Sequence, residues 1–535
     1  EVIMDRQQIL ENLKGETQTF DVVVVGGGIT GAGVAREAAG SGLKTLLVEQ
    51  KDFAWGTSSR SSKMVHGGLR YLASGHIGLT RDAVRERERM LLEAPGLVDP
   101  LPFLMPHYKG SFPGPGLFQM LLTMYDRLAG TRSHQKYTPA ETLNWAPGLD
   151  TTNLRATSRF TDAVTDDARL VQRLIAEASH DGAMCLNYVA ATAVDRDDNG
   201  TVCGLRLTAE ENAEQSAITV NTRCVINATG AWADRLQKQS ATDHPLTIRP
   251  LRGSHLVIPW HKLPVTCAVS LMHPDDRRPV FAFPWAGATV LGTTDLEHAK
   301  DLNEEPAITG GEVNYLLQIA TRLFPGATIE RADVLSTWAG VRPVVTDGGG
   351  KAPSRENREH AIRHDKGLIS IAGGKLTTFR QMARQALAMA LGDQHEDRLR
   401  SDEQRVFTAT PNDRKPDDIP ALAWHRLGGY YGPHRQSILN NGDATGIPDT
   451  GVLWAELEWA CRHEQVQHLD DLMLRRTRLG LILPDGAASL LPEIRNRCQS
   501  LLGWDDARWH QEQERYLATY RKAYQLPMGE DARDA

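Results

Sequence analysis

Residues 21–33 of this chain read DVVVVGGGITGAG, so that four valines run directly into a glycine-rich turn. An uninterrupted apolar run of this kind is typical of a strand buried on both faces of a covered parallel sheet. Gly26, Gly28 and Gly31 occupy the glycine positions of a dinucleotide-binding fingerprint. There they permit a tight turn, close approach of a pyrophosphate and close packing of the next helix. The stretch therefore predicts a βαβ unit that binds a nucleotide.

The residues after the turn complete the expected unit. Ile29 and Thr30, followed by the small residues of 32–39, predict the start of a helix that contacts the cofactor. The next apolar stretch, KTLLVE, ends on Glu49, whose carboxylate we expect to accept hydrogen bonds from the adenosine ribose. An ordinary βα turn is the alternative, and the fingerprint alone does not separate NAD from FAD.

Length and composition limit the remaining choices. A chain of 535 residues is expected to form about two to three domains. Its 60 basic and 67 acidic side chains give a net charge of -7, which provides no global positive field for nucleic acid. The six cysteines lie far apart, which predicts a reducing compartment and no metal site. With no leader and no apolar run of about 18 residues, we expect a cytoplasmic protein, with contact to the inner face of the cell membrane left open.

Periodicity predicts two further kinds of structure beyond the βαβ unit. Short alternating strands between 245 and 300 predict an antiparallel sheet, and apolar residues at helical spacing beyond 420 predict a helical domain. Asp166 is expected to cap a helix rather than to take part in chemistry. The predicted oxidoreductase region, 18–392, is followed by a linker at 393–419 and an all-α domain at 420–535. Within that region the cofactor-binding parts are about 18–75, 160–235 and 335–392, and the substrate parts are about 76–159 and 236–334.

Two distant segments favour FAD over NAD. NATGAWAD at 227–234 ends a strand in a small-residue turn, and Gly373 and Gly374 precede a predicted helix in SIAGGKLTTFR. Backbone N–H groups and the dipole at a helix start stabilise negative charge on a reduced flavin. Three glycine-rich segments, far apart in the chain, would each bring the backbone close to the cofactor, which suits the long, extended FAD.

Eight motifs, in order across residues 21–380, resemble those of the FAD-dependent glycerol-3-phosphate dehydrogenases, within the D-amino-acid-oxidase-like flavoproteins. The motifs are VVVVGGGITGAGVAREAAGSGLKTLLVE, TSSRSSKMVHGGLRYL, TDDARLV, INATGAWAD, RGSHLVIP, LGTTD, WAGVRPVVTD and AGGKLTTFR. The resemblance implies an α/β Rossmann-type FAD-binding domain, an antiparallel-sheet substrate domain and an all-α C-terminal domain. It implies oxidation of sn-glycerol 3-phosphate to dihydroxyacetone phosphate by hydride transfer from C2 to FAD N5, followed by electron delivery to a membrane quinone.

The same resemblance assigns cofactor contacts beyond the first turn. The hydroxyls of Ser61 and Ser62 lie in TSSRSS, which as an alternative is a flexible polar linker. The other predicted contacts are His66, Gly67, Ala191, Thr229, Gly230, Gly374, Lys375, Leu376 and Thr377.

A phosphate dianion requires local cations, and arginine forks match phosphate oxygens. The predicted substrate-binding residues are Arg70, Tyr71, His255, Arg342, Arg358 and Lys375. Of these, His255, Lys375 and Arg70 are also assigned to catalysis. Arg355, three positions before Arg358, is the alternative for that position. For each of these arginines and for Lys375, the alternative is an ordinary surface cation with no role in binding.

Removal of the C2 hydroxyl proton requires a base with a pKa near the operating pH, which histidine provides. His255, in RGSHLVIP, matches the family position that faces the substrate, and His66, in KMVHGG, matches one near the flavin. A structural histidine in a strand is the alternative for His255. Which histidine is the base stays open.

A quinone acceptor would require contact with the membrane surface. In LFQMLLTMYDRL, residues 117–128, Phe118, Leu121, Leu122 and Tyr125 lie at helical spacing. The segment predicts either an amphipathic helix in the membrane interface or an ordinary core helix.

Three other functions compete with the dehydrogenase. An α-glycerophosphate oxidase would use oxygen and release hydrogen peroxide, a flavin amine or amino-acid oxidase would bind a carboxylate, and a flavin-binding scaffold would have no activity. We also expect a homodimer.

Overall fold

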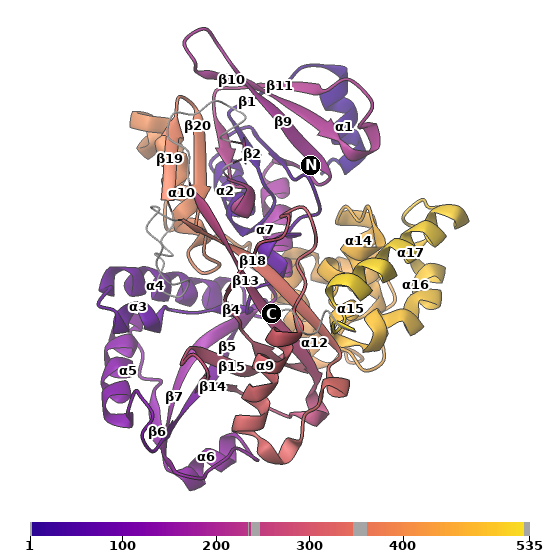
Figure 1. The fold of residues 1–535 in the computed structure, drawn as a ribbon. Coiled ribbons are helices and arrows are strands. Elements are labelled where there is room, and N and C mark those ends of the chain that lie inside the picture. Colours follow the sequence, from indigo (N-terminus) through magenta and orange to yellow (C-terminus); the bar gives the residue numbers. More distant parts are fainter. Residues whose placement is uncertain (1–2, 234, 237–246, 346–360, 529–535) are drawn as a thin grey trace.

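The computed structural model describes residues 3–233, 235–236, 247–345 and 361–528. These residues form three β-sheets and a C-terminal group of helices (Figure 1). No helix within them is long and apolar enough to cross a membrane.

The first sheet has six strands in the order β19-β20-β12-β2-β3-β8, and all but β19 are parallel. The strands are β2 (Val22–Val25), β3 (Thr45–Val48), β8 (Met184–Leu186), β12 (Val225–Asn227), β19 (Ala361–Asp365) and β20 (Leu368–Ala372). One face is covered by α2 (Ile29–Gly40), α7 (Asp167–His180) and α10 (Phe379–Leu391). The other is covered by α1 (Arg6–Gly15) and the second sheet, β1 (Thr19–Phe20), β9 (Val189–Arg196), β10 (Val202–Ala209) and β11 (Ile218–Thr222).

The four valines of β2 explain why this strand lies at the centre. All four are buried. Val22 and Val24 pack among the helices, whereas Val23 and Val25 pack toward the second sheet. The predicted strand with two buried faces is therefore confirmed, because alternate side chains point to opposite faces of a sheet.

The third sheet, mainly antiparallel, confirms the predicted antiparallel region. Its strands are β4 (Met64–Val65), β5 (Val98–Tyr108), β6 (Gln135–Tyr137), β7 (Leu154–Thr165), β13 (Ile248–Pro259), β14 (Ala268–Met272), β15 (Pro279–Trp285), β16 (Ala288–Gly292), β17 (Leu296–Glu297) and β18 (Ser336–Val345). Helices α6 (Pro139–Trp145) and α9 (Gly310–Leu323) share a core with it. The long pair β13 and β18 runs from this sheet toward the first one (Figure 1).

Helices α3 (Leu69–Ala73), α4 (Ile77–Glu93) and α5 (Pro115–Ala129) contact one another at one edge of the molecule (Figure 1). Helix α5 is the helix predicted at 117–128. Phe118, Leu122 and Tyr125 are buried, so the core alternative is correct for this face and the predicted membrane face is wrong there.

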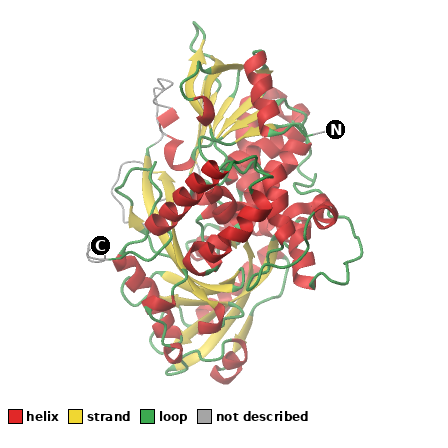
Figure 2. Ribbon diagram, turned by 90° about the vertical axis from the view of Figure 1, so that its right-hand side faces the viewer, coloured by secondary structure: helices red, strands yellow, loops and turns green. Residues whose placement is uncertain are grey.

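The C-terminal region is helical, as predicted. It consists of α12 (Ala421–Tyr431), α13 (Arg435–Asn441), α14 (Trp454–His463), the π-helical segment η10 (Asp471–Arg476), α15 (Leu479–Ile482), α16 (Leu491–Cys498) and α17 (Asp506–Ala523). Helices α14 to α17 and η10 share one hydrophobic core with Val257 and Trp338 of the third sheet, whereas α12 and α13 pack in a smaller core with Leu453 and Ala455. Figure 1 shows the C-terminal helices in yellow at the right-hand side of the molecule, and Figure 2 views the molecule from that side. The domain boundaries stay a prediction.

Candidate active site

The carboxyl ends of four parallel strands meet at one edge of the six-stranded sheet, which is where such sheets bind ligands. Gly26 follows β2, Glu49 follows β3, Thr229 follows β12 and Gly373 follows β20. The three glycine-rich segments predicted to approach FAD are therefore neighbours in space. Strands β13 and β18 reach the same edge, because both contact η3 (Gly230–Trp232) and β18 also contacts β20.

Glycine is required where these turns meet. Gly26 has a φ of +116°, and a Cβ atom there would lie 2.2 Å from the carbonyl oxygen of Ala228. A Cβ at Gly31 would lie 1.8 Å from the Gly26 oxygen, and one at Gly374 would lie 2.5 Å from Thr30 Oγ1. The first turn of α2 is therefore packed closely between the ends of β12 and β20.

The start of α2 has the features of an anion site. Its N-cap residue, Gly28, has no side chain to bond the N–H groups of the first turn. The N–H of Ile29 donates to Ser58 Oγ at 2.9 Å. These N–H groups and the positive end of the helix dipole favour a phosphate at this position.

Glu49 is held in place at the end of β3. Its two carboxylate oxygens accept hydrogen bonds from the N–H groups of Gly27 at 3.0 Å and Lys51 at 2.7 Å. Burial raises the pKa of Glu49, and each oxygen keeps a lone pair for a ribose hydroxyl. The Glu49 carbonyl accepts from the N–H of Val189, two residues before the predicted contact Ala191 on β9.

The loop after the first βαβ unit connects this edge to the third sheet. Ser61 donates from its hydroxyl to Asp167 at 2.6 Å, and the Ser62 hydroxyl lies 2.9 Å from His255 Nε2. These contacts engage both serine hydroxyls within the protein. Their predicted contact with the cofactor stays a prediction.

The next part of the loop meets the turn between β20 and α10. The N–H of His66 donates to Thr377 Oγ1 at 3.2 Å, and the N–H of Gly67 donates to the Tyr125 hydroxyl at 2.8 Å. Helix α10 begins only at Phe379, so the segment with Lys375, Leu376 and Thr377 is a turn, and the glycines before it lie farther from the helix start than predicted.

Two predicted cations gather at this turn. The Lys375 ammonium lies 4.4 Å from the centre of the Tyr71 ring, and Tyr71 follows Arg70 on α3. Desolvation and repulsion from Lys375 and Arg70 lower the pKa of His66. We refer to Arg70, Lys375, Tyr71 and His66 as the cation cluster.

His255 lies on β13, between β16 and β18 of the third sheet, and is almost fully buried. Its ring stacks on Trp338 of β18 at 4.9 Å, and a Cβ atom at Gly292 of β16 would lie 2.1 Å from its Cδ2. Nδ1 has no hydrogen-bond partner among the described residues. Burial, with repulsion from Lys63 and Arg342, holds the pKa of His255 well below its usual range, so the ring is neutral near pH 7.

Arg342 is paired with an anion inside the protein. Its guanidinium donates to Asp295 at 2.7 Å and to the carbonyl of Thr294 at 3.2 Å. Asp295 also pairs with Arg278 at 3.3 Å, so two guanidinium groups share one carboxylate. Arg342 lies near enough to His255 for its charge to disfavour protonation of the ring. Arg358 and Arg355 lie outside the described residues.

Sequence reasoning did not identify Lys63 and Asp167 as parts of the site. Asp166 caps α7 by accepting from the Arg169 N–H at 3.2 Å, as predicted. Its neighbour Asp167 instead bonds the ammonium of Lys63 at 2.8 Å, and both side chains are fully buried. A lysine in a polar loop gives no sequence signal of burial, because its partner is distant in the chain.

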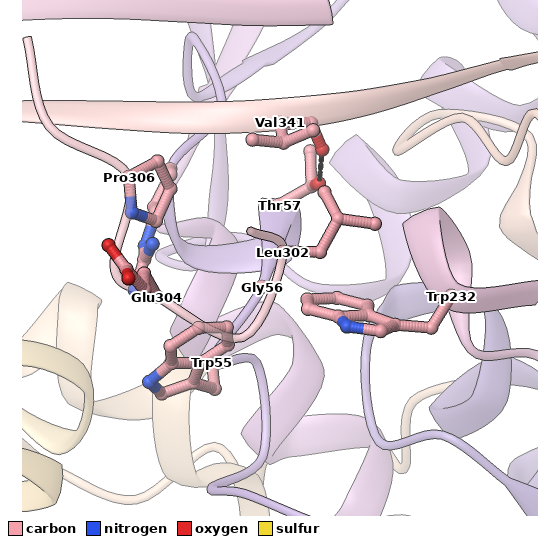
Figure 3. A pocket seen from close by; sticks show the side chains of 9 residues that line it. Trp55, Gly56, Thr57, Trp232, Leu302, Glu304, Pro306 and Val341 are labelled. Carbon is pink, nitrogen blue, oxygen red and sulfur yellow. Dashed lines mark hydrogen bonds between the residues drawn. The ribbon is translucent and has the colours of Figure 1, made fainter. Parts of the chain in front are cut away.

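A separate pocket lies beside the loop (Figure 3). Trp55 and Trp232 line it with their ring centres 6.0 Å apart, and the Thr57 hydroxyl donates to the carbonyl of Val341. The described substrate candidates do not line this pocket. The candidate active site is therefore the junction of the FAD-binding edge with β13 and β18.

A Rossmann-type sheet whose carboxyl edge meets an antiparallel sheet defines the class of FAD-dependent oxidoreductases of the D-amino-acid-oxidase type. Residues 21–380 match the family described as FAD dependent oxidoreductase, and residues 369–509 match the C-terminal domain of alpha-glycerophosphate oxidase. The chain belongs to the FAD-dependent oxidoreductase family. The glycine turns, the start of α2 and Glu49 fit FAD as its cofactor.

Relatives over nearly the whole length are glycerol-3-phosphate dehydrogenases. The aerobic glycerol-3-phosphate dehydrogenase of Staphylococcus haemolyticus is 33% identical over 506 residues, 89% of each chain. The glycerol-3-phosphate dehydrogenase of Mycobacterium leprae is 34% identical and covers 94% of this chain and 88% of its own.

Solved structures show the same arrangement. The glycerol-3-phosphate dehydrogenase from Bacillus halodurans, complexed with FAD, has a TM-score of 0.72 at 26% identity and covers 96% of this chain and 97% of its own. An L-alpha-glycerophosphate oxidase from Mycoplasma pneumoniae has a TM-score of 0.59 at 18% identity, covers 74% of this chain and 100% of its own, and shares the fold.

Proposed function

We propose that this enzyme oxidises sn-glycerol 3-phosphate to dihydroxyacetone phosphate and passes the electrons to a membrane quinone. The observation that carries the proposal is the placement of His255 and the cation cluster at the two ends of one short segment, residues 62–71. The names of the similar dehydrogenases support the same substrate.

The substrate phosphate would bind the cation cluster. Arg70 and Lys375 supply cationic side chains, and Tyr71 adds a hydroxyl donor. Charge-assisted hydrogen bonds to a phosphate dianion are the strongest polar contacts available to such a ligand. Arg342, which shares the Asp295 carboxylate with Arg278, is a second candidate to contact the phosphate or the developing charge at C2.

His255 is the base that the geometry favours. The N–H of Gly68 donates to His66 Nδ1 at 3.1 Å, so neutral His66 carries its own proton on Nε2 and acts there as a donor. His255 Nε2 instead faces the Ser62 hydroxyl, which can donate to it. In this proposal the C2 hydroxyl proton passes to Ser62 Oγ while the Ser62 proton passes to His255 Nε2.

FAD supplies the hydride acceptor at N5. The residues of the chain hold the substrate and accept its hydroxyl proton. Burial of His255 keeps its imidazole in the neutral form that accepts a proton, and it also makes the ring a weaker base than the sequence predicted, because its pKa lies well below the usual range.

An exposed apolar face of helix α5 supports a membrane-bound acceptor. This face differs from the one that the sequence analysis predicted. Leu117, Met120 and Met124 are 42%, 55% and 38% exposed, on the side opposite the buried Phe118. Phe112, just before the helix, is also exposed. Apolar side chains in one row on an exposed helix favour the membrane interface. We propose contact with the inner face of the cell membrane by this row, and assembly of a homodimer.

The second candidate is an oxidase that transfers electrons to oxygen and releases hydrogen peroxide. The match of residues 369–509 to the C-terminal domain of alpha-glycerophosphate oxidase favours it. Stopped-flow oxidation of the reduced enzyme separates the two functions. The dehydrogenase is reoxidised rapidly by a soluble quinone and slowly by oxygen, whereas the oxidase shows the reverse order.

Anaerobic titration tests the substrate. We expect sn-glycerol 3-phosphate to bleach the yellow flavin absorbance, and glycerol or an amino acid to leave it unchanged. Glycerol provides the control because it lacks only the phosphate. Unchanged absorbance with sn-glycerol 3-phosphate would contradict the proposal.

A further inference from the structure

One buried carboxylate fixes the turn from Ser59 to Lys63. Asp167 accepts from the Ser61 N–H at 3.0 Å, the Ser61 hydroxyl at 2.6 Å and the Lys63 ammonium at 2.8 Å. The ammonium also donates to the Ser59 carbonyl at 2.6 Å. Lys63 and Asp167 are fully buried, so water does not compete for these hydrogen bonds.

The C-terminal region adds a second cation to this carboxylate. Arg478, which directly precedes α15, donates to Asp167 Oδ1 at 2.6 Å, to Asp166 Oδ1 at 3.0 Å and to the Ser59 carbonyl at 3.2 Å. The guanidinium therefore contacts both the turn itself and the carboxylate that holds it. It comes from a residue 311 positions beyond Asp167 in the chain.

The charges in this cluster balance. Asp166 and Asp167 are matched by Lys63 and Arg478, and all four side chains are buried. Loss of Arg478 would leave two buried carboxylates facing one ammonium, an arrangement that strongly disfavours the native contacts. Entry of water at Asp167 would then loosen the hydrogen bonds to Ser61.

The turn leads directly to the proposed site. Trp338 Nε1 donates to the Ser61 carbonyl at 3.2 Å, and the Trp338 ring stacks on His255. Ser62, the next residue, bonds His255 Nε2. A displacement of the Ser61 backbone therefore changes the position of the Ser62 hydroxyl relative to the imidazole.

We propose that Arg478 is a positioning residue: it holds the Ser59–Lys63 turn through Asp167 and so places the Ser62 hydroxyl against His255. This gives the C-terminal helices a role in assembling the active site. The effect on reaction rate rests on the proposed function, whereas the effect on the turn does not.

A second buried ion pair provides a control. It shows whether an effect of Arg478 comes from positioning the turn or only from attaching the C-terminal helices to the rest of the protein. Arg169 on α7 binds Glu464, beyond α14, with two hydrogen bonds of 2.9 Å. This pair is also buried and also joins the C-terminal helices to the FAD-binding region, but it does not touch the Ser59–Lys63 turn. Glu464→Gln is therefore the control for Arg478→Gln.

Hydrogen exchange of the FAD-loaded protein measures the turn directly. We expect Arg478→Gln to increase exchange at the Ser61 and Lys63 amides about tenfold or more. Flavin reduction at saturating sn-glycerol 3-phosphate should slow about tenfold or more with little change in KM. Arg478→Lys should retain part of the exchange protection and part of the flavin reduction rate, because lysine keeps the positive charge but lacks the several N–H donors of a guanidinium. Glu464→Gln should lower the melting temperature but leave the turn and the reduction rate near wild type.

Three results would overturn the proposal. They are wild-type exchange at the turn in Arg478→Gln, wild-type flavin reduction in that variant, and equal slowing by Glu464→Gln. If Arg478→Gln does not fold, Arg478→Lys provides the comparison. If sn-glycerol 3-phosphate fails to reduce the wild-type flavin, the proposed function fails, while exchange at Ser61 and Lys63 still tests whether Arg478 holds the turn.

Discussion

Ser62 Oγ lies 2.9 Å from His255 Nε2, although the two residues are 193 positions apart in the chain. The contact joins the loop of the FAD-binding region to β13 of the antiparallel sheet. It provides a hydroxyl that can pass a proton to a buried, neutral imidazole.

The Ser62–His255 pair should control the rate of proton removal. We expect Ser62→Ala to slow flavin reduction about tenfold and His255→Asn about a hundredfold or more, with little change in KM. Anaerobic stopped flow with sn-glycerol 3-phosphate measures both rates. Ser158→Ala is the control, because Ser158 forms a similar 2.7 Å contact with buried His107 outside the site. Wild-type rates in both site variants would remove the pair from the mechanism.

Gly292 should be required for the position of the His255 ring. In Gly292→Ala the new methyl group would meet His255 Cδ2 at 2.1 Å, which forces the ring or the strand to move. We expect the free energy of unfolding to fall by about 1–3 kcal/mol and flavin reduction to slow. Denaturant unfolding and stopped flow measure these effects. Gly326→Ala is the control because its Cβ meets no atom within 4 Å, and equal effects of both variants would contradict the prediction.

Lys375 should contribute to phosphate affinity more than to the chemical step. We expect Lys375→Met to raise KM for sn-glycerol 3-phosphate about tenfold or more and to weaken competitive inhibition by inorganic phosphate. Steady-state kinetics with a soluble acceptor measure both values. Lys14→Met, at an exposed position on α1, should leave them unchanged. Unchanged phosphate inhibition in Lys375→Met would place the phosphate elsewhere.

The exposed row on α5 should bind membranes. We expect the double variant Leu117→Lys and Met120→Lys to lose binding to liposomes in a flotation assay, since charged side chains disfavour the apolar interface. Activity with a soluble dye should persist. The control places the same charges at Leu422 and Met389, which are exposed on other helices. Liposome binding by the α5 variant at the wild-type level would exclude this row as the contact.

His468 should make stability depend on pH in the alkaline range. Although burial opposes its charge, hydrogen bonds to Glu210 at 2.9 Å and Glu512 at 2.8 Å raise the pKa of His468 to about 9. Because the pKa of His468 is higher in the folded state than in the unfolded state, its protonation stabilises the fold. This contribution is complete at pH values below the unfolded-state pKa of about 6.5 and is lost as the pH rises through about 9. The expected loss is about 3 kcal/mol.

Urea unfolding at pH 6.5 and pH 9 measures this difference, and His468→Gln should reduce it. His425→Gln is the control, because His425 makes an exposed contact with Asp99. An equal pH dependence in wild type and His468→Gln would rule out this histidine as the cause.

Local sequence determined the elements that bind the cofactor. The four valines of β2 and the glycines at positions 26, 28 and 31 specify strand, turn and helix through contacts with near neighbours. The same holds for α5, whose existence follows from the spacing of its apolar residues. The spacing did not decide which side of α5 would be buried, because both Phe118 and Leu117 are apolar.

The sequence by itself therefore determined the FAD-binding fold, the helices and the types of residue suited to the chemistry. Only the tertiary structure decided that Ser62 meets His255, that Lys63 is buried and that Arg478 reaches Asp167 from the C-terminal helices. Strand and helix patterns arise from residues a few positions apart. Buried hydrogen bonds and ion pairs instead depend on which distant segments pack together, and the chain order does not specify that geometry.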